Sequence, residues 1–285
     1  MTDFAASLSP LAPRYDAILS DVWGVIHNGV AAYPEAVDAL RRYRQGGGRV
    51  VLITNAPRPS APIRSMLDRL GVTRDAYDGI VSSGDVTRAM LEAYRGQTLH
   101  YVGPPHENDA LFEGLGITLG AASDAKALIV TDLDDDNDTP DDYTGRIEEW
   151  LKRDLPMICA NPDRVVEHGT QIFYCGGALA DLYEAHGGRI HMAGKPYRPI
   201  YDLALKAAET ASGRTLDRTR ILAIGDSVRT DAIGAASAGM DFVFITGSIH
   251  ADELDAFGNP DPAAIRDLVD PSGARMVGAM ARLAW

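Results

Sequence analysis

The chain has 285 residues, of which 46% are hydrophobic and 24% charged, a composition typical of one large or two modest globular domains. Its 40 acidic residues outweigh 27 basic ones and give a net charge of −13, which disfavours nucleic acid and anionic membrane surfaces as partners. No apolar run reaches the roughly 20 residues that a membrane-spanning helix needs.

Two further features bear on where the protein works. Residues 1–16 lack the basic stretch and following apolar segment of a secretory signal. Two cysteines, Cys159 and Cys175, are too few for a disulfide framework or a multi-cysteine zinc site. We therefore expect a cytoplasmic protein.

In the first third of the chain, strands alternate with helices. An apolar strand over 15–20 leads to Asp21, and a helix begins at Pro34 and ends at three glycines. A β-branched strand over 49–54, a helix over 60–71, a strand over 79–83 and a helix over 84–95 follow. This order predicts an α/β fold with a mostly parallel sheet.

The rest of the chain continues the alternation. Strands are expected over 98–103, 127–133, 155–160, 189–193, 220–225 and 241–246, and helices over 107–114, 141–153, 177–186, 197–211 and 229–238. Over residues 250–285 we expect one or two short helices and a tail. The acidic stretch over 132–142 is interpreted as a solvated loop, because it lacks the glycine and the spaced glutamate of a calcium loop.

Polar side chains follow several of the predicted strands. Asp21 follows the first strand, Thr54 and Asn55 lie where the second ends, and Asp226 follows the strand over 220–225. In open α/β sheets, ligands bind at the carboxyl ends of the strands. Taken singly, each of these residues is as well explained as a turn former or helix cap. Their ordered occurrence, with Lys195 and Asp231 added, favours one site.

These segments resemble the motifs of the haloacid dehalogenase (HAD) superfamily. DVWGVIHNG (21–29) is similar to its first motif, LITN (52–55) to the second, GKP (194–196) to the third and GDSVRTD (225–231) to the fourth. Within the superfamily, the chain resembles subclass IIA, the sugar-phosphatase and 4-nitrophenylphosphatase-like branch with a large α/β cap. The resemblance implies a Rossmann-like parallel-sheet core over 1–83 and 190–285, with an inserted cap domain over 84–189.

The resemblance also implies a role for each motif residue. Asp21, Thr54 and Lys195 would be catalytic, with Asp21 forming an aspartyl-phosphate. Thr54, Asn55 and Lys195 would bind the phosphate. The cofactor Mg²⁺ would be held by Asp21, the backbone carbonyl of Trp23, Asp226 and Asp231. The cap would close over the site and select the leaving group.

One position departs from the family pattern. Superfamily phosphatases usually carry a second aspartate two residues after the nucleophile, as general acid and base, and here that residue is Trp23 (DxWG in place of DxDG). An indole N–H does not titrate near neutral pH, so it cannot protonate a leaving group. His27 and Asn28 lie nearby in sequence as substitutes, although such residues are more often ordinary polar loop residues.

Three functions are therefore compatible with the sequence. The first is a Mg²⁺-dependent phosphatase acting on a small phosphorylated metabolite, slow or selective for good leaving groups. The second is a phosphate-binding or regulatory protein that has lost turnover, and the third is another phosphoryl or carbon-bond chemistry. Retention of the nucleophile favours an enzyme, whereas Trp23 favours the alternatives. The substrate is not apparent from the sequence, and a homodimer is an open possibility.

Overall fold

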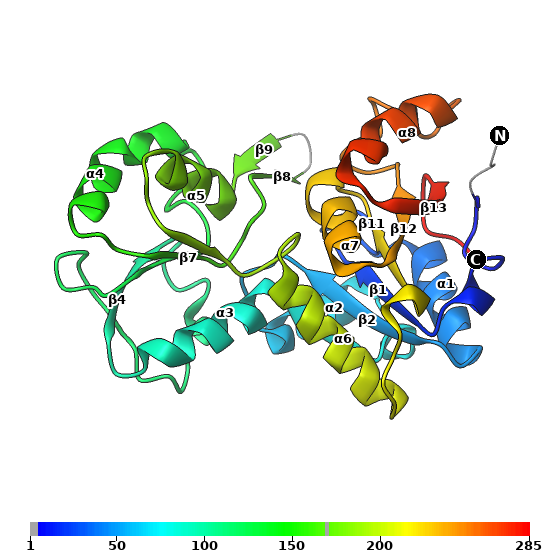
Figure 1. Cartoon of the computed structure of the whole chain (residues 1–285), viewed down its shortest axis with the longest axis horizontal. Coiled ribbons are helices and arrows are strands. Elements are labelled where there is room, and N and C mark those ends of the chain that lie inside the picture. Colours follow the sequence, from blue (N-terminus) through cyan, green and yellow to red (C-terminus); the bar gives the residue numbers. More distant parts are fainter. Residues whose placement is uncertain (1–4, 169–170) are drawn as a thin grey trace. The chain divides into compact units, whose positions relative to one another are not determined.

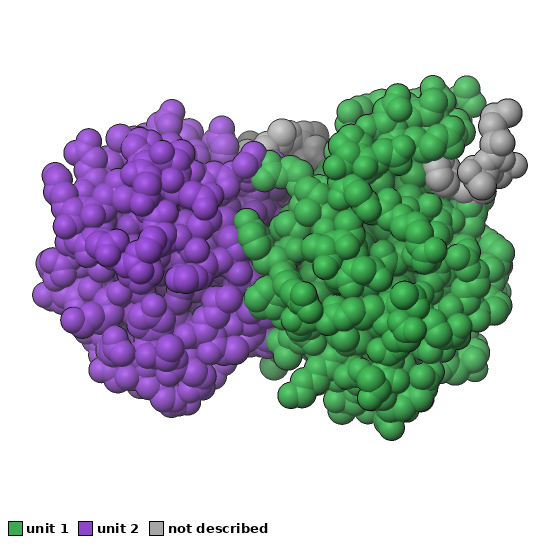
Figure 2. All heavy atoms as spheres, in the orientation of Figure 1, with its two compact units in different colours: residues 1–54, 61–81, 195–285 green, residues 55–60, 82–194 purple. Residues whose placement is uncertain are grey.

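The computed structural model describes residues 5–168 and 171–285; residues 1–4, which the predicted core range includes, lie outside the described residues. The chain forms two compact units (Figure 2). The first comprises residues 1–54, 61–81 and 195–285, and the second comprises 55–60 and 82–194. The second unit is therefore largely one continuous insertion between two parts of the first.

The first unit is built on a six-stranded sheet with the order β13-β12-β11-β1-β2-β3 (Figure 1). The strands are β1 (Ala17–Asp21), β2 (Arg49–Thr54), β3 (Gly79–Ser82), β11 (Ile221–Gly225), β12 (Asp241–Ile245) and β13 (Arg275–Met280). β1 pairs in parallel with both β2 and β11, and β12 pairs in parallel with β11 and β13. β1, β11 and β12 are buried along their whole length, as expected of parallel strands covered on both faces.

Helices alternate with these strands along the chain. They are α1 (Pro34–Gln45), α2 (Ser60–Leu70), α6 (Arg198–Ser212), α7 (Ile233–Ala238) and α8 (Pro262–Val269). In α1, proline occupies the first turn, where no backbone donor is lost, and Ala36, Ala39, Leu40 and Tyr43 form its buried stripe. α1 and α6 both contact β2. The predicted α/β fold with a Rossmann-like parallel-sheet core is confirmed.

The second unit has its own sheet, in the order β10-β7-β6-β4-β5. Its strands are β4 (Thr98–Val102), β5 (Thr118–Leu119), β6 (Leu128–Val130), β7 (Met157–Cys159) and β10 (Ile190–Met192), and its helices are α3 (Ser83–Leu91), α4 (Thr144–Lys152) and α5 (Gly176–Ala185). β8 (Val165–His168) and β9 (Gln171–Tyr174) form a separate antiparallel pair. Buried clusters line the sheet, one around Trp150 and Tyr183 and the other around Leu99 and Ile129.

Several predicted elements need correction. The expected helix over 107–114 is only a single 3-10 turn at Asp109–Leu111, because prolines before it and a glycine after it leave too little chain. The region 250–285 contains, besides α8, the strand β13, whose glycine and methionines give a weak strand signal. The pair β8–β9 was not expected. Residues 134–137 are exposed, so the acidic stretch is a solvated loop at that point.

Within the described ranges, no helix combines the length and the apolar character needed to cross a bilayer.

Candidate active site

The candidate site lies at the carboxyl ends of three adjacent strands of the first unit. Asp21 is the last residue of β1, Thr54 is the last residue of β2, and Asp226 directly follows β11. β1 lies between the other two strands in the sheet. Because the three strands run in parallel, their ends lie on one edge of the sheet. All three side chains are buried.

A short turn adds a third carboxylate. Ser227 begins a π-helical turn over Val228–Ala232, and its backbone N–H donates to Asp231 Oδ2 at 3.1 Å. Asp231 is thereby directed back toward the strand ends. One carboxylate oxygen each of Asp21, Asp226 and Asp231 lies within 4.8 Å of the others. The structure therefore brings together the three aspartates that the sequence singled out.

Lys195 connects two of these aspartates. Its Nζ lies 2.6 Å from Asp21 Oδ1 and 2.8 Å from Asp231 Oδ1, and its side chain is only 3% exposed. A buried ammonium is costly unless it is paired. Here it has two carboxylate partners, which fix its position beside Asp21.

The electrostatics of the site favour a bound cation. Three buried carboxylates and one ammonium would carry a net charge of −2 if all were ionised. Burial, with the charges of Asp21 and Asp231, raises the pKa of Asp226 well above its usual value. Burial and Asp21 raise the pKa of Asp231 to about 6, against the opposing effect of Lys195. Oxygen ligands crowded to this degree match the preference of a hard divalent cation, and its charge would offset their repulsion.

The loop after β1 approaches the cluster closely at Gly24. Its φ is +78°, and a Cβ there would lie 2.0 Å from Asp226 Oδ2 and 2.3 Å from Ser248 Oγ. Only glycine satisfies both restrictions. Ser248 hydrogen-bonds to Asp226 and lies in the segment after β12. Sequence analysis missed Ser248, although its place after a predicted strand was the available signal.

Trp23 is held by the same loop. Its indole lies over Gly29, where a Cβ would be 2.5 Å from the ring, and it meets the His27 ring edge-on at 5.2 Å. His27 is fully buried, and burial lowers its pKa to about 4. It is therefore neutral near neutral pH and cannot act as an acid there. Asn28 accepts backbone N–H groups from Val30 and Ala31, which assigns it to the turn.

Asn55 follows Thr54 in the chain but belongs to the second unit. Its side-chain amide donates to Asp163 Oδ1 at 2.9 Å, and its side chain is buried. The side chain is thus engaged inside the second unit, and the predicted phosphate contact of Asn55 would fall to its backbone N–H.

Three aspartates and a lysine lie together beside the strand ends of a parallel sheet, and comparison with known proteins assigns the chain to a class of hydrolases. The family model described as haloacid dehalogenase-like hydrolase matches residues 18–118, and a second, described as HAD-hydrolase-like, matches residues 192–271. A solved hydrolase of the haloacid dehalogenase-like family from Brucella suis is 41% identical, with 98% of this chain and 99% of that chain covered and a TM-score of 0.86. The chain belongs to the haloacid dehalogenase-like hydrolases.

More distant relatives are similar over most of the chain. A possible sugar phosphatase of the HAD superfamily from Cytophaga hutchinsonii is 22% identical, with 96% of each chain covered and a TM-score of 0.77. Chronophin of Bos taurus is 26% identical over 275 residues, which cover 88% of each protein. These similarities extend over both units of the chain.

Proposed function

We propose that this protein is a Mg²⁺-dependent phosphatase that hydrolyses a small phosphomonoester through an aspartyl-phosphate on Asp21. The observation that carries the proposal is the buried cluster of Asp21, Asp226 and Asp231, with Lys195 bonded to two of its members. A binding protein needs no carboxylate fixed by a lysine at a strand end. The likeness to a possible sugar phosphatase supports the same class of reaction.

In the proposed first step, a carboxylate oxygen of Asp21 attacks the phosphorus of the ester. The bond from phosphorus to the ester oxygen breaks, and its electron pair leaves with the alcohol. Lys195, 2.6 Å from Asp21, orients the nucleophile and neutralises charge on the transferred group. Thr54 and the backbone N–H of Asn55 bind the phosphoryl oxygens.

In the second step, water attacks the aspartyl-phosphate, releases inorganic phosphate and a proton, and restores Asp21. The oxygens of Asp21, Asp226, Asp231 and the Trp23 carbonyl would hold Mg²⁺. When bound, Mg²⁺ supplies positive charge that allows a dianionic phosphate to approach a carboxylate. Residues 84–189 would serve as the cap domain that selects the leaving group.

The leaving group receives no proton from Trp23 in this scheme. His27, with its lowered pKa, and Asn28, engaged in a turn, do not replace the missing acid. The proton must therefore come from water, so that esters with acidic leaving groups react fastest. We therefore propose that Trp23, in the DxWG sequence, makes the enzyme selective for esters with acidic leaving groups.

Trp23 is also the observation behind a second candidate, a phosphate-binding protein without turnover. A screen of aryl and alkyl phosphate esters with and without Mg²⁺ separates the two. The phosphatase proposal predicts Mg²⁺-dependent release of phosphate from aryl esters that Asp21→Asn abolishes. Binding of a phosphate analogue without release of phosphate from any ester would favour the second candidate.

A further inference from the structure

A cavity of about 530 Å³ opens at the other edge of the first unit's sheet. Its lining includes Asp16, Arg49 and Arg220, which stand at or directly before the first residues of β1, β2 and β11. β1 and β2 end at Asp21 and Thr54, and Asp226 directly follows β11. At about 3.3 Å per residue, the five residues of β1 place the cavity roughly 16 Å from the carboxylate cluster. The cavity is thus separate from the proposed catalytic site.

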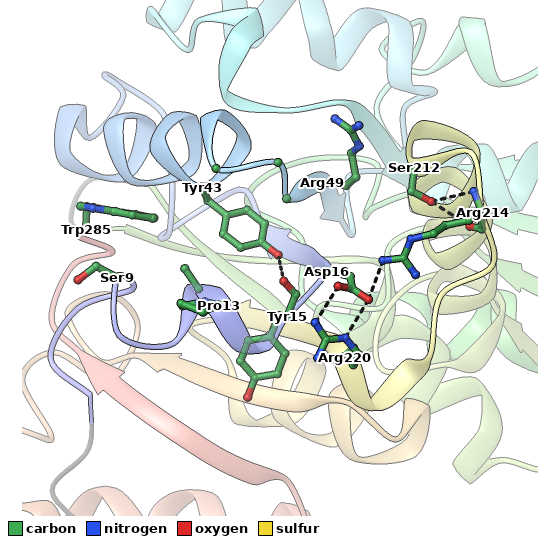
Figure 3. Close-up of a pocket in the computed structure, with 14 residues that line it drawn as sticks. Ser9, Pro13, Tyr15, Asp16, Tyr43, Arg49, Ser212, Arg214, Arg220 and Trp285 are labelled. Atoms are coloured by element: carbon green, nitrogen blue, oxygen red, sulfur yellow. Dashed lines mark hydrogen bonds and ion pairs between the residues drawn. The ribbon is translucent and has the colours of Figure 1, made fainter.

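The charged residues that line this cavity are three arginines and one aspartate, Arg49, Arg214, Arg220 and Asp16 (Figure 3). Nε and Nη2 of Arg220 each donate to one oxygen of Asp16 at 2.9 Å. Arg214 Nη2 also lies 2.9 Å from Asp16 Oδ2. The hydrogen bond from Arg220 helps lower the pKa of Asp16 to about 2. The side chains of the lining therefore carry a net charge of +2 near neutral pH.

The positive charge of these arginines exceeds what is needed to neutralise Asp16. Arg220 alone already engages both of its oxygens, and Arg49 reaches another carboxylate, Asp78, only at 3.8 Å. The arginine side chains are 35–58% exposed, so they remain accessible to a ligand. Asp16 already lies between Arg214 and Arg220, so a further anion would be held by the guanidinium donors that Asp16 does not engage. In a chain of net charge −13, such a group is typical of an anion site rather than of a solvated surface.

Aromatic side chains complete the lining. Tyr43 is buried, its hydroxyl donates to the Tyr15 carbonyl at 2.9 Å, and its ring packs against Gly48. Trp285 is half-buried and, in Figure 3, lies on the opposite side of Tyr43 from Arg214 and Arg220. The indole of Trp285 can accept a planar ligand by stacking, whereas the buried Tyr43 ring forms part of the wall. The cavity is therefore aromatic on one side and cationic on the other.

The glycines at 46–48 do not form a phosphate-binding loop, although they line the cavity. Their backbone N–H groups already donate to carbonyls of Arg42, Arg44 and Tyr43. Recognition of an anion falls to the guanidinium groups, whose planar donors match phosphate oxygens in pairs.

We propose that this cavity is a second binding site, for a nucleotide-sized anion in which a planar ring is joined to a phosphate group. The ring lies on Trp285, and the phosphate lies beside Arg214 and Arg220. The volume falls in the range of small-molecule pockets. The site does not depend on the proposed phosphatase activity, because it shares no residue with the carboxylate cluster.

The three tryptophans provide separate reporters of ligand binding. Trp285 lines the cavity, Trp23 lies in the loop after Asp21, and Trp150 is buried in the core of the second unit. Their indole N–H resonances in NMR spectra are assigned with single Trp→Phe variants. The resonances are then followed while adenosine 5′-monophosphate is added to the full chain. Phosphorus spectra of the same samples show that the nucleotide stays intact. A response of Trp23 reports the catalytic site independently.

We expect the Trp285 resonance to shift to saturation while Trp150 does not move. Arg214→Gln should raise the midpoint of that shift about tenfold, because a charge-assisted contact to phosphate is lost. Arg74→Gln is the matched control, since it removes an exposed arginine that pairs with Asp68 away from the cavity. Its midpoint should equal that of the wild type, and an unchanged Trp23 resonance before nucleotide is added shows that the first unit of each variant is folded.

Three outcomes would overturn the proposal. The first is a Trp285 resonance that does not respond to millimolar nucleotide. The second is an equal midpoint in Arg214→Gln and Arg74→Gln, which would reduce the arginines to a structural role around Asp16. The third is inorganic phosphate binding as tightly as the nucleotide, which would show that the planar ring does not contribute to binding.

Discussion

The two edges of the first unit's sheet carry opposite arrangements of charge. At the carboxyl ends of the strands, three buried aspartates surround one lysine. At the amino ends, two partly exposed arginines, Arg214 and Arg220, bind one aspartate, and Arg49 lines the same cavity. The same residue type behaves differently in each place: burial raises the pKa of Asp231 to about 6, whereas arginine contacts lower that of Asp16 to about 2. Environment, rather than residue type, decides which edge is suited to a metal cation and which to an anion.

The largest expected effect concerns the single cation at the carboxyl edge. Lys195→Met should lower kcat/KM by about 10²–10³-fold, because charge on the transferred phosphoryl group loses its fixed partner. The measurement is phosphatase activity toward an aryl ester at saturating Mg²⁺, with folding checked by thermal denaturation. Lys206→Met, which alters an exposed lysine on α6, is the control. Equal activity in the two folded variants would separate Lys195 from the reaction.

The next effect tests the missing acid at the same edge. Trp23→Asp should raise kcat/KM for an alkyl phosphate by about 10²-fold relative to an aryl phosphate, since it supplies a titratable group. The loss of the indole from Gly29 leaves a cavity that costs a few kcal/mol. Trp23→Ala reproduces the cavity without the acid and serves as the control. A wild type that hydrolyses both esters equally well would contradict the role given to Trp23.

A smaller effect distinguishes the two edges by their response to Mg²⁺. At concentrations about a hundredfold above its Kd, Mg²⁺ should raise the Tm of the wild type by about 5 °C. Asp226→Asn should lose most of this shift. Asp16→Asn, the same chemical change at the amino edge, should keep it. If both variants respond as the wild type does, the cation does not bind at the carboxylate cluster.

The smallest effect is the pH dependence of the arginine–aspartate group. The folded pKa of Asp16, about 2, lies below its ordinary value of 3.8, so its stabilising contribution is complete above that value and disappears as pH falls toward 2. Asp16→Asn should cost about 1 kcal/mol at neutral pH, because exposed arginine partners are screened by solvent. Urea unfolding at several pH values measures the difference. A cost that stays constant into acid would show that ionisation of Asp16 does not contribute.

Much of the fold could be predicted because the core strands are almost uniformly apolar. The stretches over 50–53 and 221–225 are apolar throughout, as expected of strands covered on both faces. The strand β13 and the pair β8–β9 were missed because edge and paired strands depend on partners distant in sequence, not on local propensity. The turn at Asp109–Leu111 shows the opposite error, in which a short helical pattern had no room to extend.

The site was predictable to the extent that it follows strand ends. Asp21 and Asp226 stand directly at those ends, and the structure places Asp231 beside them. Ser248 was missed although it follows a predicted strand, whereas the buried state of His27 arises from loop packing and could not be foreseen. The amino edge was not predicted at all: Asp16, Arg49 and Arg220 precede strands, where no known motif directs attention, and Arg214 is an ordinary exposed arginine in sequence.

The discontinuity of the first unit has a consequence for its assembly during synthesis. Ala17 pairs with Arg49 on one side and with Ile221 on the other, so the central strand lacks one neighbour until about two hundred further residues have emerged. The second unit, which is nearly continuous, can complete its own sheet first. Pairings between residues so distant in sequence form slowly and leave apolar strand edges accessible in the interval. The nascent first unit is therefore the part of the chain most exposed to aggregation and to capture by chaperones.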